Sequence, residues 1–131
     1  MIVPLIFILK VVYINLKYYN NKSRGEKMSS IKLINNEQAE KLIKDNKELL
    51  IIDVRKFSEF KKSRIINSKN IPVEELEWEL EELEDFKDKP ILVYCKVGAK
   101  SSVACAMLEE EGFKDLYNLR GGILDYTGAI E

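Results

Sequence analysis

Residues 91–102 read ILVYCKVGAKSS, and this stretch predicts a buried strand, a short loop and a helix. Four apolar residues lead directly to Cys95, as in a strand that is covered on both faces. Gly98 permits a tight loop, and Ser101 and Ser102 are good residues for opening a helix. The stretch therefore places Cys95 at the carboxyl end of a strand, where ligands bind in open parallel sheets.

The sequence around Cys95 favours a reactive thiolate. Backbone N–H groups of the loop would converge on the sulfur at the positive end of a helix dipole, and Lys96 and Lys100 would add positive charge nearby. The alternative is a buried, inert cysteine at the end of a strand. A glycine-containing loop between two lysines is an unusual place for an inert thiol. We therefore predict that Cys95 is a nucleophile whose pKa lies below its ordinary value.

The composition of the 131-residue chain limits the chemistry that can accompany this thiol. The chain contains no histidine, which excludes a Cys-His pair, a Ser-His-Asp triad and a histidine-ligated metal. Its two cysteines are too few for a disulfide framework, and Cys105, about three helical turns beyond Cys95, is expected to be a small core residue. Neither a Cys-x-x-Cys pair nor a carboxylate cluster indicates a metal site. We expect no metal and no cofactor.

The charge is unevenly distributed along the chain. Residues 1–27 contain five basic residues and one acidic residue, a net charge of +4. Because the whole chain carries −1, residues 28–131 carry −5. An acidic globular part argues against a nucleic-acid partner. We expect a folded domain at residues 28–131, preceded at residues 1–27 by an apolar segment and a basic linker.

The apolar segment, residues 2–16, has three interpretations. It is shorter than the ~20 residues that span a bilayer, and it lacks the basic start and cleavage site of a signal peptide. As a membrane anchor, it would hold the domain in the cytoplasm at the inner membrane face, because the basic residues follow it. It could instead be an upstream extension from a misassigned start codon, or a segment that packs on the domain.

From residue 30 onward, apolar runs alternate with helical patterns. Strands are expected at residues 31–34, 49–54, 69–71, 91–94 and 115–119. Helices are expected after an Asn36 cap, at residues 57–61, in an acidic segment at residues 74–86, and after Cys95. Strands that alternate with helices predict an α/β fold, an open parallel sheet with helices on both faces.

Several separated motifs resemble the rhodanese-like sulfurtransferase family, in its single-domain form. The resemblance covers about residues 30–131 and rests on the order of these motifs along the chain. They are Ile51-Ile52-Asp53-Val54-Arg55 with Glu59-Phe60, then Asn70-Ile71-Pro72, then Cys95 to Ser101, and finally Leu119-Arg120-Gly121-Gly122-Ile123.

The resemblance implies that Cys95 accepts a sulfane sulfur, becomes a persulfide and passes the sulfur to a thiophile. The donor would be thiosulfate or a protein or low-molecular-weight persulfide, and the acceptor a thiol. Asp53 and Arg55 would support the site, and an ion pair of Arg55 with Glu59 is expected. The loop that binds the substrate would consist of Lys96, Val97, Gly98, Ala99, Lys100 and Ser101.

Two other functions remain open on this fold. The six residues from Cys95 to Lys100 match the loop length of the sulfur-transferring members, whereas the related phosphatases have a loop one residue longer that usually ends in arginine. Lys100 stands where the family commonly has arginine, and a lysine lacks bidentate geometry for an anion. The alternatives are a non-enzymatic interaction module and a cysteine phosphatase or arsenate reductase.

Overall fold

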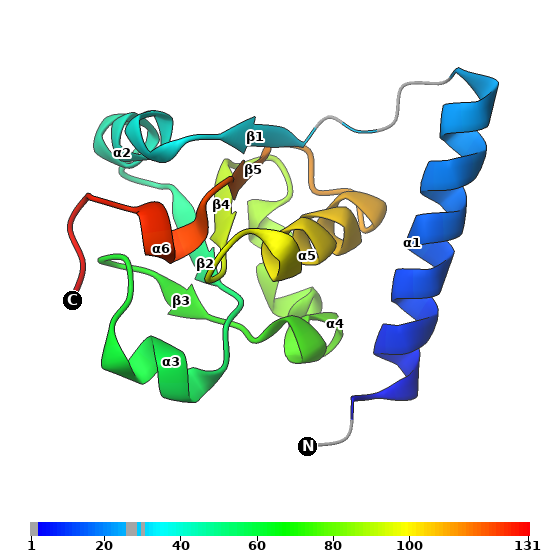
Figure 1. Ribbon diagram of the computed structural model, residues 1–131, viewed down its shortest axis with the longest axis horizontal. Helices are drawn as coiled ribbons and strands as arrows, with labels where there is room; N and C mark the ends of the chain where they lie inside the picture. The colour runs from blue at the N-terminus through cyan, green and yellow to red at the C-terminus, as the bar shows by residue number, and fades with distance from the viewer. Residues whose placement is uncertain (1–2, 26–28, 30) are drawn as a thin grey trace.

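Five short strands form one parallel sheet in the computed structural model, which describes residues 3–25, 29 and 31–131 (Figure 1). The spatial order is β1-β5-β4-β2-β3, and β4 is central because it pairs in parallel with both β2 and β5. This confirms the predicted open parallel sheet. The strands are β1 (Lys32–Ile34), β2 (Leu50–Asp53), β3 (Lys69–Asn70), β4 (Ile91–Tyr94) and β5 (Leu116–Leu119).

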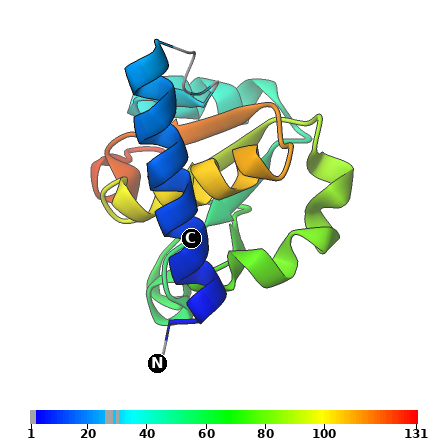
Figure 2. The same cartoon turned by 90° about the vertical axis from the view of Figure 1, so that its right-hand side faces the viewer.

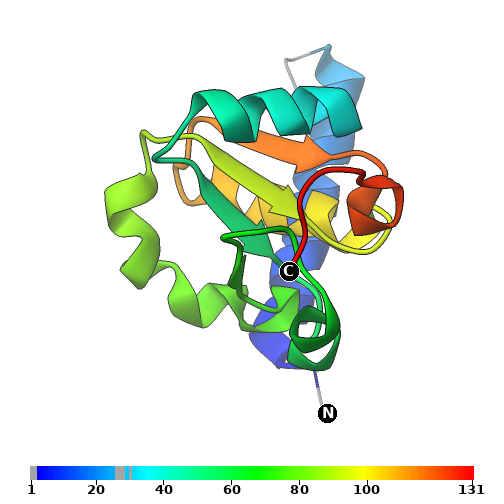
Figure 3. The same cartoon turned by 90° about the vertical axis from the view of Figure 1, so that its left-hand side faces the viewer.

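Helices cover both faces of the sheet, as the alternating pattern predicts (Figure 3). One face is covered by α5 (Ala99–Glu110), α4 (Leu76–Glu79) and the 3₁₀ helices η1 (Val73–Glu75) and η2 (Glu81–Phe86). The other face is covered by α2 (Asn36–Asp45) and α6 (Gly122–Asp125). A further short helix, α3 (Phe57–Lys62), connects β2 to β3.

Neighbouring residues of the central strands point into two separate cores. Ile52 and Val93 belong to the core beneath α5, whereas Ile51 and Leu92 belong to the core beneath α2. This follows from the two-residue repeat of a strand. All four residues of β4 are buried, which accounts for the uninterrupted apolar run that ends at Cys95.

The acidic segment at residues 74–86 differs from the prediction of one helix. It forms η1, α4 and η2 in succession. Acidic side chains repeat throughout it, and like charges three or four residues apart destabilise a continuous helix. Leu76 and Leu83 are nevertheless buried and Leu80 packs against them, so the predicted apolar face is correct although the regular helix is not.

The cap of α2 also lies one residue earlier than predicted. Asn35, not Asn36, accepts a hydrogen bond from the backbone N–H of Gln38, and the Gln38 side chain accepts one from the backbone N–H of Asn35. This reciprocal pair is a capping box. Because Gln38 stands three residues after Asn35, only Asn35 has the spacing that the box requires.

The N-terminal segment forms helix α1 (Leu5–Arg24), which lies beside α5 outside the sheet (Figures 1 and 2). Phe7 and Ile14 pack against the core beneath α5. Lys10 and Lys17 donate to acidic side chains at the end of α5, each at 2.8 Å. These contacts correspond to the interpretation in which the segment packs on the domain.

The expected linker and domain boundary are only partly visible. Helix α1 extends to Arg24, well into the polar stretch that the sequence assigns to a linker. The boundary at Met28 lies outside the described residues. In the part of the chain that the structure describes, no helix is both long and apolar enough to cross a membrane.

Candidate active site

Cys95 follows the last residue of β4, and the chain then wraps around its sulfur. The backbone N–H of Gly98 donates to Cys95 Sγ at 3.0 Å, and the backbone N–H of Ser101 donates at 3.4 Å. The Ser101 hydroxyl oxygen also lies 3.4 Å from the sulfur. Helix α5 begins at Ala99, earlier than the serines suggest, so Ser101 lies in its first turn with its amide directed at Cys95.

This environment lowers the pKa of the Cys95 thiol. Burial acts in the opposite direction and is the largest single influence, because it disfavours the charged thiolate. The Ser101 hydroxyl and the backbone N–H groups of Ser101, Gly98 and Val97 outweigh it by donating to the sulfur. Aligned donors inside the loop therefore stabilise the thiolate form of Cys95.

The two lysines lie on the loop, as the sequence predicts, but neither hydrogen-bonds to the sulfur. Lys96 and Lys100 are both exposed on the loop, as are Val97 and Ala99. The hydrogen bonds to Cys95 Sγ come from Gly98 and Ser101 rather than from either lysine. The side chains of both lysines therefore lie on the outer surface of the loop.

Two features of the loop require a glycine at position 98: the backbone conformation of the turn and the close approach of the Arg120 backbone. Its φ of +104° is one that side chains rarely adopt, and a Cβ at this position would lie 2.5 Å from the Arg120 carbonyl oxygen. The loop therefore packs directly against the segment that follows β5. A glycine at this position allows the amide to reach the Cys95 sulfur.

On the other side of the loop, the backbone of Gly122 packs closely against the backbone of Cys95 and Lys96. Its φ is +63°, and a Cβ would lie 2.1 Å from the Lys96 carbonyl oxygen and 2.7 Å from the Cys95 carbonyl oxygen. The next amide, that of Ile123, donates to the Cys95 carbonyl oxygen at 2.9 Å. The Gly-Gly motif therefore has a physical role: it lets α6 approach the backbone of the cysteine loop.

Asp53 and Arg55 form a buried pair at the end of β2. The Arg55 guanidinium contacts the Asp53 carboxylate at 2.6 to 3.1 Å and donates to the Ser63 carbonyl oxygen at 2.6 Å. The expected pair of Arg55 with Glu59 is therefore wrong, because the adjacent carboxylate matches the guanidinium fork. Burial acts to lower the pKa of Arg55, but Asp53 outweighs it and raises that pKa. The pair therefore connects the end of β2 to the backbone of Ser63.

Asn118 is a site residue that the sequence reasoning missed. It lies in β5 and is 3% exposed. Its side chain accepts a hydrogen bond from Ser101 Oγ at 2.6 Å and donates one to Ser102 Oγ at 2.9 Å. The only signal in the sequence is an amide within an otherwise apolar strand, and its contact with Ser101 depends on how α5 packs on the sheet.

Cys105 lies away from this chemistry. It is fully buried in the core beneath α5, which confirms the prediction of a small core residue. Burial raises the pKa of its thiol, and the negative charges of Glu109 and Cys95 act in the same direction. Cys105 is therefore a protonated thiol, unsuited to act as a nucleophile.

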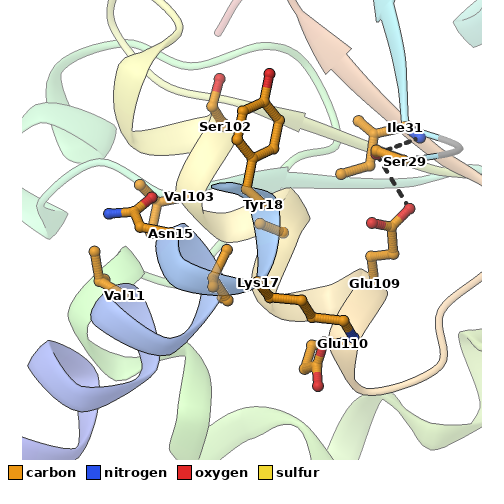
Figure 4. Close-up of a pocket in the computed structure, with 12 residues that line it drawn as sticks. Val11, Asn15, Lys17, Tyr18, Ser29, Ile31, Ser102, Val103, Glu109 and Glu110 are labelled. Carbon is orange, nitrogen blue, oxygen red and sulfur yellow. Dashed lines mark hydrogen bonds and ion pairs between the residues drawn. The ribbon is translucent and has the colours of Figure 1, made fainter. Parts of the chain in front are cut away.

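A separate cavity of about 580 Å³ lies between α1 and α5 (Figure 4). Val11, Ile14 and Val103 contribute apolar surface, and the hydroxyls of Tyr18 and Ser102 lie at one end. Cys95 is not among the lining residues. The cavity is a gap between the N-terminal helix and the domain rather than the mouth of the cysteine loop.

A central parallel strand that ends in a thiol, held by the amides of a loop and a helix, defines a class of cysteine-dependent α/β domains. The chain belongs to the Rhodanese-like domain family, whose family model matches residues 35–129. That range includes the cysteine loop, the Asp53–Arg55 pair and the Gly-Gly motif.

Curated relatives and solved structures agree with this assignment. A sulfurtransferase of Allochromatium vinosum is 31% identical over 94 residues, which cover 72% of this chain and 86% of that protein. The crystal structure of a rhodanese-related protein from Thermoplasma volcanium has a TM-score of 0.67 and 29% identity, and the match covers 76% of this chain and 97% of that one.

Another relative is much longer than this chain. A tRNA uridine(34) hydroxylase of Cytophaga hutchinsonii is 37% identical over 89 residues, which cover 66% of this chain but 28% of that protein. The match therefore concerns one part of the hydroxylase. The relatives together place this chain in a family that includes sulfurtransferases.

Proposed function

We propose that the protein is a sulfurtransferase or persulfide carrier in which Cys95 is the sulfur-carrying nucleophile. The observation that carries this proposal is the convergence of the Gly98 and Ser101 amides on Cys95 Sγ at 3.0 and 3.4 Å. Those donors stabilise a thiolate. The same donors suit the terminal sulfur of a persulfide, which also carries negative charge.

The reaction has two displacement steps. With thiosulfate as donor, the Cys95 thiolate attacks the sulfane sulfur, a new S–S bond forms, and the bond to the sulfonate sulfur breaks as sulfite leaves with its electron pair. The product is a Cys95 persulfide. An acceptor thiolate, or cyanide in an assay, then attacks the terminal sulfur, and Cys95 leaves as a thiolate. Lys96 and Lys100 form the rim that attracts the anionic donor.

A mass measurement combined with an activity assay tests this proposal. Cys95→Ser should reduce thiocyanate formation from thiosulfate and cyanide to background, because a hydroxyl does not accept sulfane sulfur under these conditions. Protein treated with thiosulfate should gain about 32 Da, a gain that cyanide removes. Cys105→Ser is the matched control and should keep both signals. Hydrolysis of an aryl phosphate would instead favour the phosphatase, and inactivity in every assay would favour the interaction module.

For helix α1 we propose contact with a membrane surface. Its outward side exposes Leu5, Leu9, Val12 and Leu16 at 50 to 69%. Its two mid-helix lysines point the other way, into the ion pairs with α5. A helix with an uncharged apolar outer side can lie in the headgroup region of a membrane. The folded domain would then cover the opposite side of α1, which faces away from the membrane.

Vesicle flotation tests this contact. The full chain should float with phosphatidylcholine vesicles, and Leu9→Glu combined with Leu16→Glu should abolish flotation. Leu33→Glu is the matched control, because Leu33 is 51% exposed on β1 and distant in sequence from α1. The proposal would be wrong if the full chain fails to float and elutes as a dimer that the α1 variant does not form. The exposed side of α1 would then contact a second copy of the chain.

A further inference from the structure

A buried amide lies one hydrogen bond away from the candidate nucleophile. Asn118 Oδ1 accepts from Ser101 Oγ at 2.6 Å, and Ser101 Oγ lies 3.4 Å from Cys95 Sγ. The other end of the amide is fixed, because Asn118 Nδ2 donates to Ser102 Oγ at 2.9 Å. With Nδ2 bound to Ser102, the oxygen of the Asn118 amide must face Ser101.

The Ser101 hydroxyl has a single proton to donate. While Cys95 is a neutral thiol, its S–H donates to Ser101 Oγ, and the Ser101 proton goes to Asn118 Oδ1. When Cys95 becomes a thiolate, its sulfur can only accept, and the Ser101 proton must turn towards it. The asparagine oxygen and the thiolate therefore compete for one proton. The Gly98 carbonyl oxygen, 3.1 Å from Ser101 Oγ, is a more distant acceptor for the same proton, and it also accepts from Ser102 Oγ at 2.8 Å.

We propose that Asn118 is a positioning residue that sets the acidity of Cys95 by controlling the direction of the Ser101 hydroxyl. The role in sulfur transfer rests on the proposed function. In the persulfide, negative charge resides on the terminal sulfur, and the Ser101 proton can remain on Asn118. Asn118 therefore acts on the free thiolate, the state in which Cys95 Sγ itself carries the charge.

Two substitutions with opposite expected effects test this role. Asn118→Leu removes the competing acceptor at similar volume, and Ser102 is exposed enough for water to replace its lost donor. The midpoint of Cys95 alkylation by iodoacetamide against pH should then fall, with the thiolate fraction below the midpoint rising about threefold. Asn118→Asp adds a stronger, charged acceptor and should raise the midpoint.

A merely structural role gives a different pattern. If Asn118 only supports the loop, both substitutions loosen the Ser101 contact and raise the midpoint. An unchanged or raised midpoint for Asn118→Leu would therefore overturn the proposal, as would a lowered midpoint for Asn118→Asp. In a Ser101→Ala background, Asn118→Leu should leave the midpoint unmoved, and a persisting shift there would also contradict the mechanism.

The alkylation readout is independent of sulfur transfer. Cys95 reacts with iodoacetamide whether or not it accepts sulfane sulfur, so a failure of the proposed function does not obscure this test. Circular dichroism and urea unfolding of each variant establish that the fold is intact. In the sulfur-transfer assay, Asn118→Leu should release its sulfur to cyanide faster, because the departing thiolate is better stabilised.

Discussion

Replacing Gly122 with alanine should damage both stability and the cysteine loop. The new Cβ would lie 2.1 Å from the Lys96 carbonyl oxygen and 2.4 Å from its carbonyl carbon. Real Cβ atoms do not approach backbone so closely, and backbone cannot turn aside as a side chain can. Either α6 moves outward or the residues after Cys95 move, and both changes disturb the loop that holds the sulfur.

The expected cost has two parts. A left-handed backbone costs a non-glycine residue about 1–2 kcal/mol. Forcing a methyl group into a packed site costs about 1–3 kcal/mol more. Gly122→Ala should therefore lower the free energy of unfolding by about 2–5 kcal/mol. The displaced Lys96 carbonyl should also reduce sulfur transfer at least about tenfold, since small misplacements near a reacting group are costly.

Gly112 provides a matched control for the backbone part of this cost. Its φ is +95°, also in the left-handed region, but the nearest atom to its Cβ position is the flexible end of Lys87 at 4.0 Å. Gly112→Ala should cost only the backbone strain, about 1–2 kcal/mol, and leave activity unchanged. Urea unfolding of both variants measures the difference. Equal destabilisation, with full activity in Gly122→Ala, would refute the proposed contact between α6 and the loop.

Three further outcomes are expected. As the pH is lowered, the alkylation rate of Cys95 should begin to fall at a lower pH than the rate of an ordinary thiol, whose pKa is about 8.5. The reason is that the pKa of Cys95 is lowered, so its thiolate persists to lower pH. Cys95→Ser provides the blank. Lys100→Arg should raise kcat/KM for thiosulfate more than Lys96→Arg does, since a guanidinium offers paired donors to a tetrahedral anion. A chain of residues 28–131 should retain activity per molecule while losing stability, because the surface that Phe7 and Ile14 cover becomes exposed; an inactive truncation would assign α1 a part in the site.

The strands and the cysteine loop could be predicted because their determinants are local. The four apolar residues of β4, the glycine at position 98 and the apolar run that forms β2 are all visible in a short window of sequence. The backbone of the acidic segment could not be predicted in this way. Whether it forms one continuous helix depends on repulsion between carboxylates and on where Leu76 and Leu83 reach the core. Local pattern predicted the buried side of that segment but not the shape of its backbone.

The partners of the charged groups could not be predicted from spacing. Arg55 is close in sequence to both Asp53 and Glu59, and only the turn after β2 decides that the guanidinium meets Asp53. Asn118 is separated from Ser101 by 17 residues, and their contact requires α5 to cross the sheet beside β5. Contacts of this kind depend on the packing of elements, which no local pattern contains.

The two cysteines show that burial alone does not decide the direction in which the pKa of a thiol moves. Cys95 and Cys105 are both almost fully buried, yet the pKa of the first is lowered and that of the second is raised. Burial acts to raise the pKa of both thiols, and only Cys95 has hydrogen-bond donors that outweigh it. Two amides donate to the Cys95 sulfur, whereas the Cys105 sulfur faces the Tyr117 carbonyl oxygen at 4.0 Å. Donors stabilise a thiolate, so the thiol that precedes α5 has a lowered pKa, whereas the thiol in the interior of α5, which has no such donors, has a raised one.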